Sequence, residues 1–134
     1  MRTLHNKTAV VTGAASGIGR AIALRLAAER VNLYLVDVNE PHLLSVATAA
    51  RDAGVQVTTR TCDLADLDQL AALAVDLRQH PPGIDVLVNN AGIAYYGETA
   101  RMSAADAQRL LTVNLHAPIF LTRELLPVLL SRDE

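Results

Sequence analysis

The sequence predicts an α/β fold in which a parallel sheet is doubly wound, with helices on both faces. Short runs of β-branched and apolar residues alternate with stretches of helical periodicity, and the connections are short. The apolar runs are nearly continuous, which is typical of parallel strands buried on both faces. This order favours right-handed crossovers within one sheet. Because no repeat, low-complexity segment or linker interrupts the 134 residues, a single domain over 1–134 is expected.

The first half of the chain contains two strands, each followed by a helix. The first strand, Thr8–Thr12, is β-branched and apolar, and the helix Ile18–Glu29 carries isoleucine and leucine at helical spacing. A second apolar strand, Val31–Val38, precedes a helix at Pro41–Ala53. The proline suits a first helical turn, and Gly54 is the expected stop.

The second half repeats the alternation. A third strand is predicted at Val55–Thr61, a third helix at Leu67–Arg78 and a fourth strand at Ile84–Val88, after a Pro-Pro-Gly loop. The last helical region runs from about 103 to 130. Ser103 is its expected N-cap, with an acidic residue in the first turn.

The composition is that of an ordinary globular domain. Hydrophobic residues make up 51% of the chain and the formal net charge is −2, with both signs interspersed, so no nucleic acid is expected as a partner. No run of eighteen uncharged apolar residues occurs, so no membrane association is expected. Cys62 is the single cysteine, which excludes an internal disulfide and favours a cytoplasmic location. The histidines and Cys62 lack metal-ligand spacing, so no metal site is expected.

A glycine-rich turn lies between the first strand and the first helix. Gly13, Gly17 and Gly19 would let backbone N–H groups and the positive helix end approach an anion without obstruction by side chains. The turn therefore favours pyrophosphate binding. The alternative is a tight turn with no ligand, which the position between a buried strand and an amphipathic helix disfavours.

Asp37 ends the second strand, at the same edge of the predicted sheet. A carboxylate there can accept both hydroxyls of an adenosine ribose and repels a 2′-phosphate. No basic residue stands at Val38 or Asn39 to bind such a phosphate. The expected cofactor is therefore NAD, with NADP disfavoured. The alternative roles of Asp37 are a solvated strand end or the N-cap of the next helix.

Residues Lys7 to about Leu130 resemble the N-terminal half of a classical short-chain dehydrogenase/reductase. The resemblance is carried by the glycine turn, Asp37 and three further motifs in the right order. These motifs are Cys62-Asp63-Leu64, Asn89-Asn90-Ala91-Gly92 and Asn114 within Val113-Asn114-Leu115. The resemblance implies a Rossmann-type sheet of about four strands in the order 3-2-1-4.

The resemblance also implies which residues contact the dinucleotide. Asp63 would accept a hydrogen bond from the adenine amino group, with Leu64 beside the ring, and Asn90 and Ala91 would line the site. The complete expected set is Gly13, Ser16, Gly17, Ile18, Gly19, Asp37, Asp63, Leu64, Asn90 and Ala91. Two alternatives stay open: Asp63 could cap the helix that begins near Asp66, and the Asn-Ala-Gly segment could be a purely structural turn.

Asn114 is the catalytic residue that the resemblance implies for this chain. Pro118, four residues later, has no N–H to donate, so the Asn114 carbonyl should lose its helical partner and the helix should bend. In the family this carbonyl holds a water in a proton relay to a catalytic lysine. The alternative is a proline kink that only curves the helix around the sheet.

The chain departs from the family pattern in its catalytic residues. Its tyrosines are Tyr34, Tyr95 and Tyr96, and none begins a Tyr-x-x-x-Lys sequence; Lys7 is the single lysine. The chain reaches Glu134 before the positions where the family has its catalytic serine, tyrosine and lysine. We therefore expect a truncated, NAD(P)-binding N-terminal half that is inactive alone. Tyr34 is expected in the core, and Tyr95 and Tyr96 in a solvent-facing loop.

Two functions follow. The first is a short-chain oxidoreductase that moves a hydride between NAD(H) and an unknown alcohol or carbonyl substrate, with this chain carrying the cofactor-binding part. The second is a non-catalytic dinucleotide-binding or assembly module that ends at Glu134. An open fourth-strand edge and an apolar last helix predict a homo-oligomer or a complementing C-terminal segment.

Overall fold

Four parallel strands form one sheet in the order β3-β2-β1-β4 within residues 3–132, which the computed structural model describes. The strands are β1 Thr8–Thr12, β2 Asn32–Asp37, β3 Val57–Thr61 and β4 Val86–Val88. Thr8 pairs with Asn32 on one side of β1, and Ala9 pairs with Val86 on the other. The predicted parallel sheet and its strand order are confirmed.

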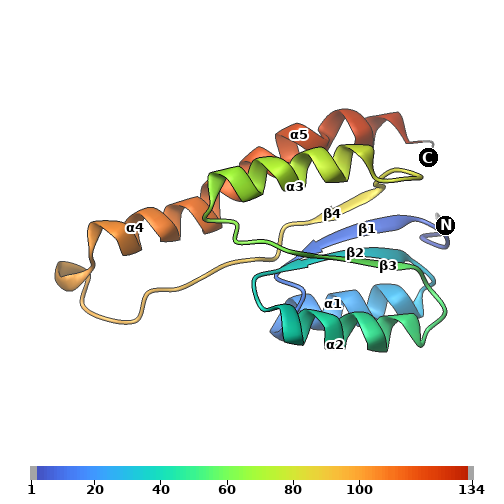
Figure 1. Ribbon diagram of the computed structural model, residues 1–134, viewed down its shortest axis with the longest axis horizontal. Coiled ribbons are helices and arrows are strands. Elements are labelled where there is room, and N and C mark those ends of the chain that lie inside the picture. The colour runs from blue at the N-terminus through green and yellow to red at the C-terminus, as the bar shows by residue number, and fades with distance from the viewer. Residues whose placement is uncertain (1–2, 133–134) are drawn as a thin grey trace.

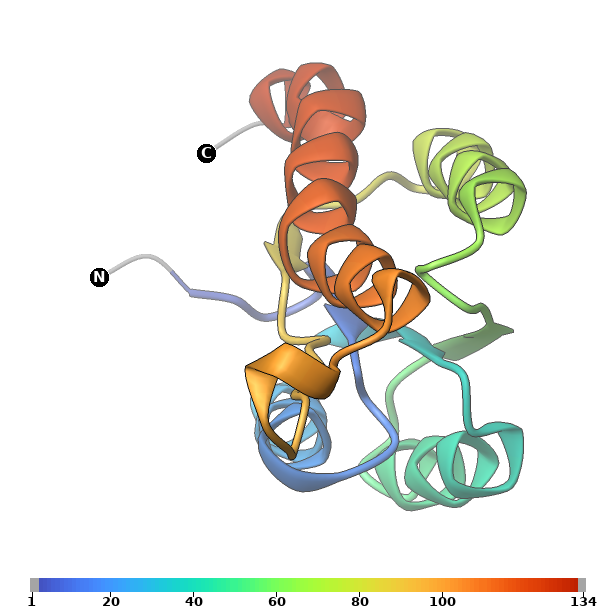
Figure 2. The ribbon, with the colours of Figure 1, turned by 90° about the vertical axis from the view of Figure 1, so that its left-hand side faces the viewer.

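Helices cover both faces of this sheet. Helices α1 and α2 lie on one face, and α3 and α5 lie on the other (Figure 1). Figure 2, which views the carboxyl ends of the strands, shows the same layers end on. The helices are α1 Gly17–Ala28, α2 Glu40–Arg51, α3 Leu67–Gln79, α4 Ala104–Leu111 and α5 Ala117–Ser131, with a short 3-10 turn, η1, at Thr99–Arg101.

The central strands bury side chains on both faces, which explains their continuous apolar sequences. Leu33 and Leu35 of β2 belong to the core beneath α1 and α2. Tyr34 and Val36, between and beyond them, belong to the core beneath α3 and α5. Successive side chains of a strand point to opposite faces, so a strand covered on both sides needs apolar residues at nearly every position. Tyr34 is 4% exposed, as predicted for a core residue.

Polar side chains cap three of the helices at their N-termini. Asn39 accepts a hydrogen bond from the His42 N–H in α2, and Ser103 accepts one from Asp106 in α4, as expected for a cap. Asp66 accepts hydrogen bonds from the first turn of α3. The caps of α2 and α3 are therefore Asn39 and Asp66, and the alternative capping roles considered for Asp37 and Asp63 are wrong.

The last helical region is interrupted between α4 and α5. Residues Thr112–His116 form a π-helical turn, η2, which ends two residues before Pro118. The N–H of Ala117 bonds to the Thr112 carbonyl, five residues back. The structure thus places a π-turn where the sequence predicts a bend; the loss of a helical partner for the Asn114 carbonyl stays a prediction. Helix α4, which precedes the π-turn in the chain, projects beyond the carboxyl ends of the strands (Figure 1).

The surface of this helical region is unusually apolar. Ala117, Leu121 and Leu125 are fully buried against the sheet and α3, whereas Leu115 and Ile119 are more than half exposed. By length and composition alone, residues Ala104–Ser131 also form a helix long enough to cross a membrane, although a core helix can meet the same criteria. The apolar surface expected from the sequence is therefore present.

Candidate functional site

A cavity of about 510 Å³ opens at the carboxyl ends of the strands. Each strand contributes to its wall through its last residue or the loop that follows. Sixteen residues line it: Gly13, Ser16, Gly17, Ile18, Val36, Asp37, Val38, Cys62, Asp63, Leu64, Asn90, Ala91, Gly92, Ile93, Arg109 and Val113. In a doubly wound α/β sheet this edge is where ligands bind.

Nine of the ten predicted contact residues line this cavity, and Gly19 does not. Asn114 is also outside the lining. The set of contact residues expected from the sequence omits seven lining residues, of which Cys62, Gly92 and Val113 belong to the quoted motifs. Arg109 had no local signal, because its sequence context is that of an ordinary solvated helical arginine. It reaches the cavity only through the placement of α4.

The glycine turn packs directly against the segment that follows β4. Gly13 has φ +65°, and a Cβ added there would lie 2.8 Å from the Ala91 Cα. The Asn90 side-chain amide donates to the carbonyls of Thr12 and Gly13, at 3.0 and 3.2 Å. Asn90 therefore holds the turn in position, and glycine at position 13 allows this close approach.

The opposite side of the turn is open toward the cavity. A Cβ added at Gly17 would meet no atom within 4 Å. Ser16, the N-cap of α1, makes no side-chain capping bond, and the first turn of α1 has no acidic residue. The positive end of this helix thus faces a space without a side chain to neutralise it, an arrangement that fits a phosphate group.

Asp37 presents its carboxylate at the end of β2. Its Oδ2 accepts the Ala15 N–H at 2.9 Å, and its Oδ1 accepts the Asn39 N–H at 3.0 Å. A carboxylate has about four acceptor positions, so these two bonds orient Asp37 and leave capacity for two further donors. That capacity fits the pair of hydroxyls of a ribose.

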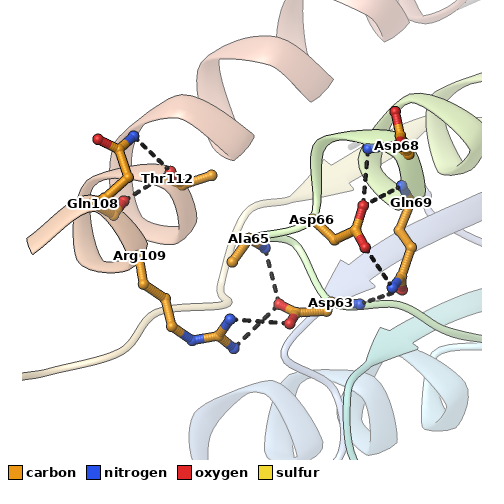
Figure 3. Close-up of polar contacts among 8 residues, drawn as sticks. All are labelled: Asp63, Ala65, Asp66, Asp68, Gln69, Gln108, Arg109 and Thr112. Atoms are coloured by element: carbon orange, nitrogen blue, oxygen red, sulfur yellow. Dashed lines mark hydrogen bonds and ion pairs between the residues drawn. The ribbon is translucent and has the colours of Figure 1, made fainter. Parts of the chain in front are cut away.

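Asp63 forms a two-point ion pair with Arg109 across the cavity wall (Figure 3). The Arg109 Nη1 lies 3.0 Å from Oδ2 and Nη2 lies 3.2 Å from Oδ1. The Ala65 N–H also donates to Oδ1. Hydrogen bonding by Arg109 lowers the pKa of Asp63, and it outweighs the opposing effect of burial. Asp63 is therefore a carboxylate at neutral pH.

Cys62 lines the same wall, but its thiol is not in the reactive thiolate form. Burial is the main reason that its pKa rises to about 11. The charge of Arg60 opposes this increase, and the charges of Asp63 and Asp66 add smaller increases. The thiol is therefore protonated at neutral pH.

Asn114 connects the helix to the cavity wall indirectly. Its side-chain Oδ1 accepts the Ile93 N–H at 2.8 Å, and its Nδ2 donates to the Ile93 carbonyl at 2.7 Å. Ile93 lines the cavity. Asn114 thus fixes the chain after the Asn-Asn-Ala-Gly motif against the π-turn, while the relay role of its backbone carbonyl stays a prediction.

The remaining titratable residues lie away from the cavity. Lys7 pairs with Asp85 at 3.5 Å near the start of β1. Tyr34, Tyr95 and Tyr96 are not among the lining residues, and Tyr96 is 94% exposed, as predicted for a solvent-facing loop. Within residues 3–132, no group of three potential metal ligands occurs.

The parallel sheet, its two helical layers and the glycine turn at its carboxyl edge define a Rossmann-type α/β domain. The family model described as short chain dehydrogenase matches residues 7–134. The chain belongs to the short-chain dehydrogenase family.

Known relatives and structures show the same membership. The chain is 37% identical over 132 residues to the ketoacyl reductase HetN of Nostoc sp., an alignment covering 98% of this chain and 46% of the relative. It is 38% identical to nodulation protein G of Rhizobium sp., covering 98% and 53%. The chain therefore spans about half the length of the curated relatives it matches.

Two solved structures share the fold closely. A metagenomic short-chain oxidoreductase in complex with NADP matches with a TM-score of 0.90 and 35% identity, covering 97% of this chain and 58% of the other. The L-sorbose reductase from Gluconobacter frateurii, complexed with NADPH and L-sorbose, matches with a TM-score of 0.88 and 30% identity, covering 95% and 49%. Both complexes contain the phosphorylated form of the cofactor.

Proposed function

We propose that this chain is the cofactor-binding part of an oxidoreductase that transfers a hydride between NAD(H) and an alcohol or carbonyl compound. The observation that carries the proposal is the cavity at the carboxyl edge of the sheet, with the open glycine turn and the Asp37 carboxylate in one wall. The family relationship supports the reaction class. A nicotinamide cofactor would supply the hydride donor or acceptor.

Different residues of the cavity would bind different parts of the dinucleotide. The turn from Gly13 to Ile18 and the N-terminus of α1 would hold the pyrophosphate, and Asp37 the adenosine ribose. Asp63 and Leu64 would contact the adenine. Asn90 and Ala91 would line the path toward the nicotinamide. Gly19 would act indirectly, by letting α1 approach the turn.

Catalysis would need groups that this sequence lacks. We propose Asn114 as its contribution to proton transfer, through the backbone carbonyl at the π-turn. A tyrosine general acid needs a nearby cation to lower its pKa, and the chain has no Tyr-x-x-x-Lys. We therefore expect the 134-residue chain to bind dinucleotide without oxidising or reducing a substrate.

The preference for NAD over NADP is expected to depend on Asp37. We expect the wild-type chain to bind NADH more tightly than NADPH in fluorescence titrations. Asp37→Asn should weaken NADH binding about tenfold or more, because it removes a charged acceptor of ribose hydroxyls. The substitution should also reduce the difference in affinity between NADH and NADPH, because it removes a charge that repels the 2′-phosphate.

Asp52→Asn is a matched control, since Asp52 lies at the end of α2 and outside the cavity lining. It should leave both affinities unchanged. Wild-type protein that bound NADPH as tightly as NADH would contradict the proposed preference. This comparison matters because the two related structures are complexes with NADP or NADPH.

We further propose that the exposed apolar face of α4, η2 and α5 self-associates. Leu111, Leu115 and Ile119 line a second hollow on this face, and each is more than half exposed. Exposed apolar patches of this kind promote association because their burial releases ordered water. The occupant that we propose is a second copy of the same chain.

Sedimentation velocity measures this association directly. We expect a concentration-dependent dimer or larger species for the wild-type chain. The double substitution Leu115→Glu and Ile119→Glu should shift it toward monomer, because association would bury two carboxylates. Leu44→Glu, on the exposed face of α2, is the control and should leave the association unchanged. A wild-type chain that stayed monomeric at every concentration would refute the proposal.

A further inference from the structure

Arg109 joins two parts of the molecule that are far apart in sequence. It lies on α4, and its partner Asp63 lies 46 residues earlier in the loop after β3. Both side chains line the cavity, and both are partly exposed, at 46% for Arg109 and 30% for Asp63. Figure 3 shows the guanidinium reaching from α4 to the carboxylate.

This contact is the main polar connection between α4 and the strand-end loops. Helix α4 has no buried residue. Among the described residues, its other side-chain hydrogen bonds stay local, from Gln108 to Thr112 for example. The position of Arg109, and with it the contact to Asp63, therefore depends on the helix that projects beyond the sheet.

Asp63 is oriented from two directions. Its backbone N–H donates to Gln69 Oε1 at 2.9 Å, and the Gln69 amide in turn donates to Asp66 Oδ2, which ties the loop to α3. Arg109 holds the carboxylate from the opposite side. Both oxygens thus have a defined position relative to the cavity.

The bonds to Asp63 leave a specific acceptor position unused. Oδ1 accepts from Ala65 N–H and Arg109 Nη2, which accounts for both of its lone pairs. Among residues 3–132, Oδ2 accepts from Arg109 Nη1 alone. Because each carboxylate oxygen has about two acceptor positions, one position remains on Oδ2.

We propose that Arg109 is a positioning residue for purine recognition, which holds the Asp63 carboxylate so that the remaining acceptor position of Oδ2 receives the exocyclic amine of adenine. This inference rests on the proposed dinucleotide site and adds a residue from α4 to it. A paired carboxylate with one position left selects a donor at the purine 6-position. Hypoxanthine, which has a carbonyl oxygen there, would face repulsion.

The competing explanation is an ordinary surface ion pair. Such pairs contribute little to stability, and their loss has no reason to change which base is bound. Base discrimination therefore separates the two explanations, whereas unfolding temperature does not. ADP and IDP are suitable probes, because they differ at the 6-position of the purine (amino against oxo) and contain no nicotinamide.

The experiment is a calorimetric titration of the full chain with ADP and with IDP. We expect the wild type to prefer ADP by about tenfold, as for a charge-assisted hydrogen bond. Arg109→Ala should lower ADP affinity and bring the ADP/IDP ratio close to one. Arg109→Lys keeps the charge but cannot bridge both oxygens, so it should give an intermediate ratio.

Two further variants make the test specific. Arg123→Ala removes an exposed arginine from α5 that pairs with Glu124 outside the cavity, and it should leave the ratio unchanged. Asp63→Asn should abolish the preference, and adding Arg109→Ala to it should have no further effect on the ratio, because the two residues act as one unit. Circular dichroism verifies that each variant is folded.

Each outcome has a distinct meaning. If Arg109→Ala keeps the wild-type ratio of ADP to IDP affinity, the positioning role is overturned. Tighter ADP binding by this variant would also overturn it, because it would show that Arg109 competes with the base for Asp63. NADH titrations in parallel test the proposed function separately: NADH binding with an Arg109-independent ratio would refute this inference alone. Failure of the wild type to bind ADP, IDP and NADH would refute both.

Discussion

Gly19→Ala is expected to destabilise the protein by about 3 kcal/mol and to weaken dinucleotide binding more than tenfold. A Cβ at this position would overlap the Gly13 carbonyl oxygen and the Asn90 side-chain amide. Neither can yield easily, because Asn90 Nδ2 and the Gly13 carbonyl are hydrogen-bonded to each other. Helix α1 would have to move away from the turn, and its N-terminus would lose its position at the cavity. Denaturant unfolding and NADH titration measure the two effects.

Gly92→Ala provides the matched control. The nearest atom to a Cβ at Gly92 is Asn114 Oδ1, at 3.4 Å, which is an ordinary contact. This variant should lose less than about 1 kcal/mol. Near wild-type stability and binding in Gly19→Ala would contradict the tight packing of α1 on the turn.

Asp85→Ala is expected to cost about 3 kcal/mol of unfolding free energy, although Asp85 is remote from the cavity lining. Its side chain is 5% exposed and accepts hydrogen bonds from the Thr8 N–H at 2.8 Å and Arg132 Nε at 2.9 Å, with Lys7 at 3.5 Å. Alanine would leave the Thr8 N–H without this acceptor in a residue that is 1% exposed. It would also disconnect the start of β4 from the end of α5.

The pH dependence of stability should reveal the same carboxylate. Burial raises the pKa of Asp85, but the bonds from Arg132 and Thr8, with the charge of Lys7, outweigh it and lower the pKa overall. A carboxyl whose pKa is lower in the folded state contributes stability above its unfolded pKa of about 3.9 and loses it as the pH falls through the folded value. Asp85→Ala should therefore lose less stability than wild type on acidification below about pH 4.

Asp76→Ala is the control for a simple ion-pair loss. Asp76 pairs with Arg60, and both side chains are about 40% exposed, so its removal should cost less than about 1 kcal/mol. Equal unfolding free energies for the two alanine variants would refute the structural role of Asp85. Denaturant unfolding at pH 7 and at several acidic values supplies all of these comparisons.

Much of the fold could be predicted because its signals are local. The continuous apolar sequence of β2 reflects a strand covered on both faces, and Ser103 caps α4 with a donor only three residues away. Gly13 and Gly17 have positive φ where the turn requires it. In each case, the residues that determine the conformation are neighbours along the chain.

The sequence by itself determined the strand order through its family resemblance, the glycine turn and nine of the residues that line the cavity. The tertiary structure alone decided that Arg109 meets Asp63, that Asn114 binds Ile93 and that Arg132 meets Asp85. These pairs are separated by 46, 21 and 47 residues. Their contacts depend on how α4, η2 and α5 are oriented over the sheet, and that orientation results from packing of the whole core rather than from any short pattern of residues.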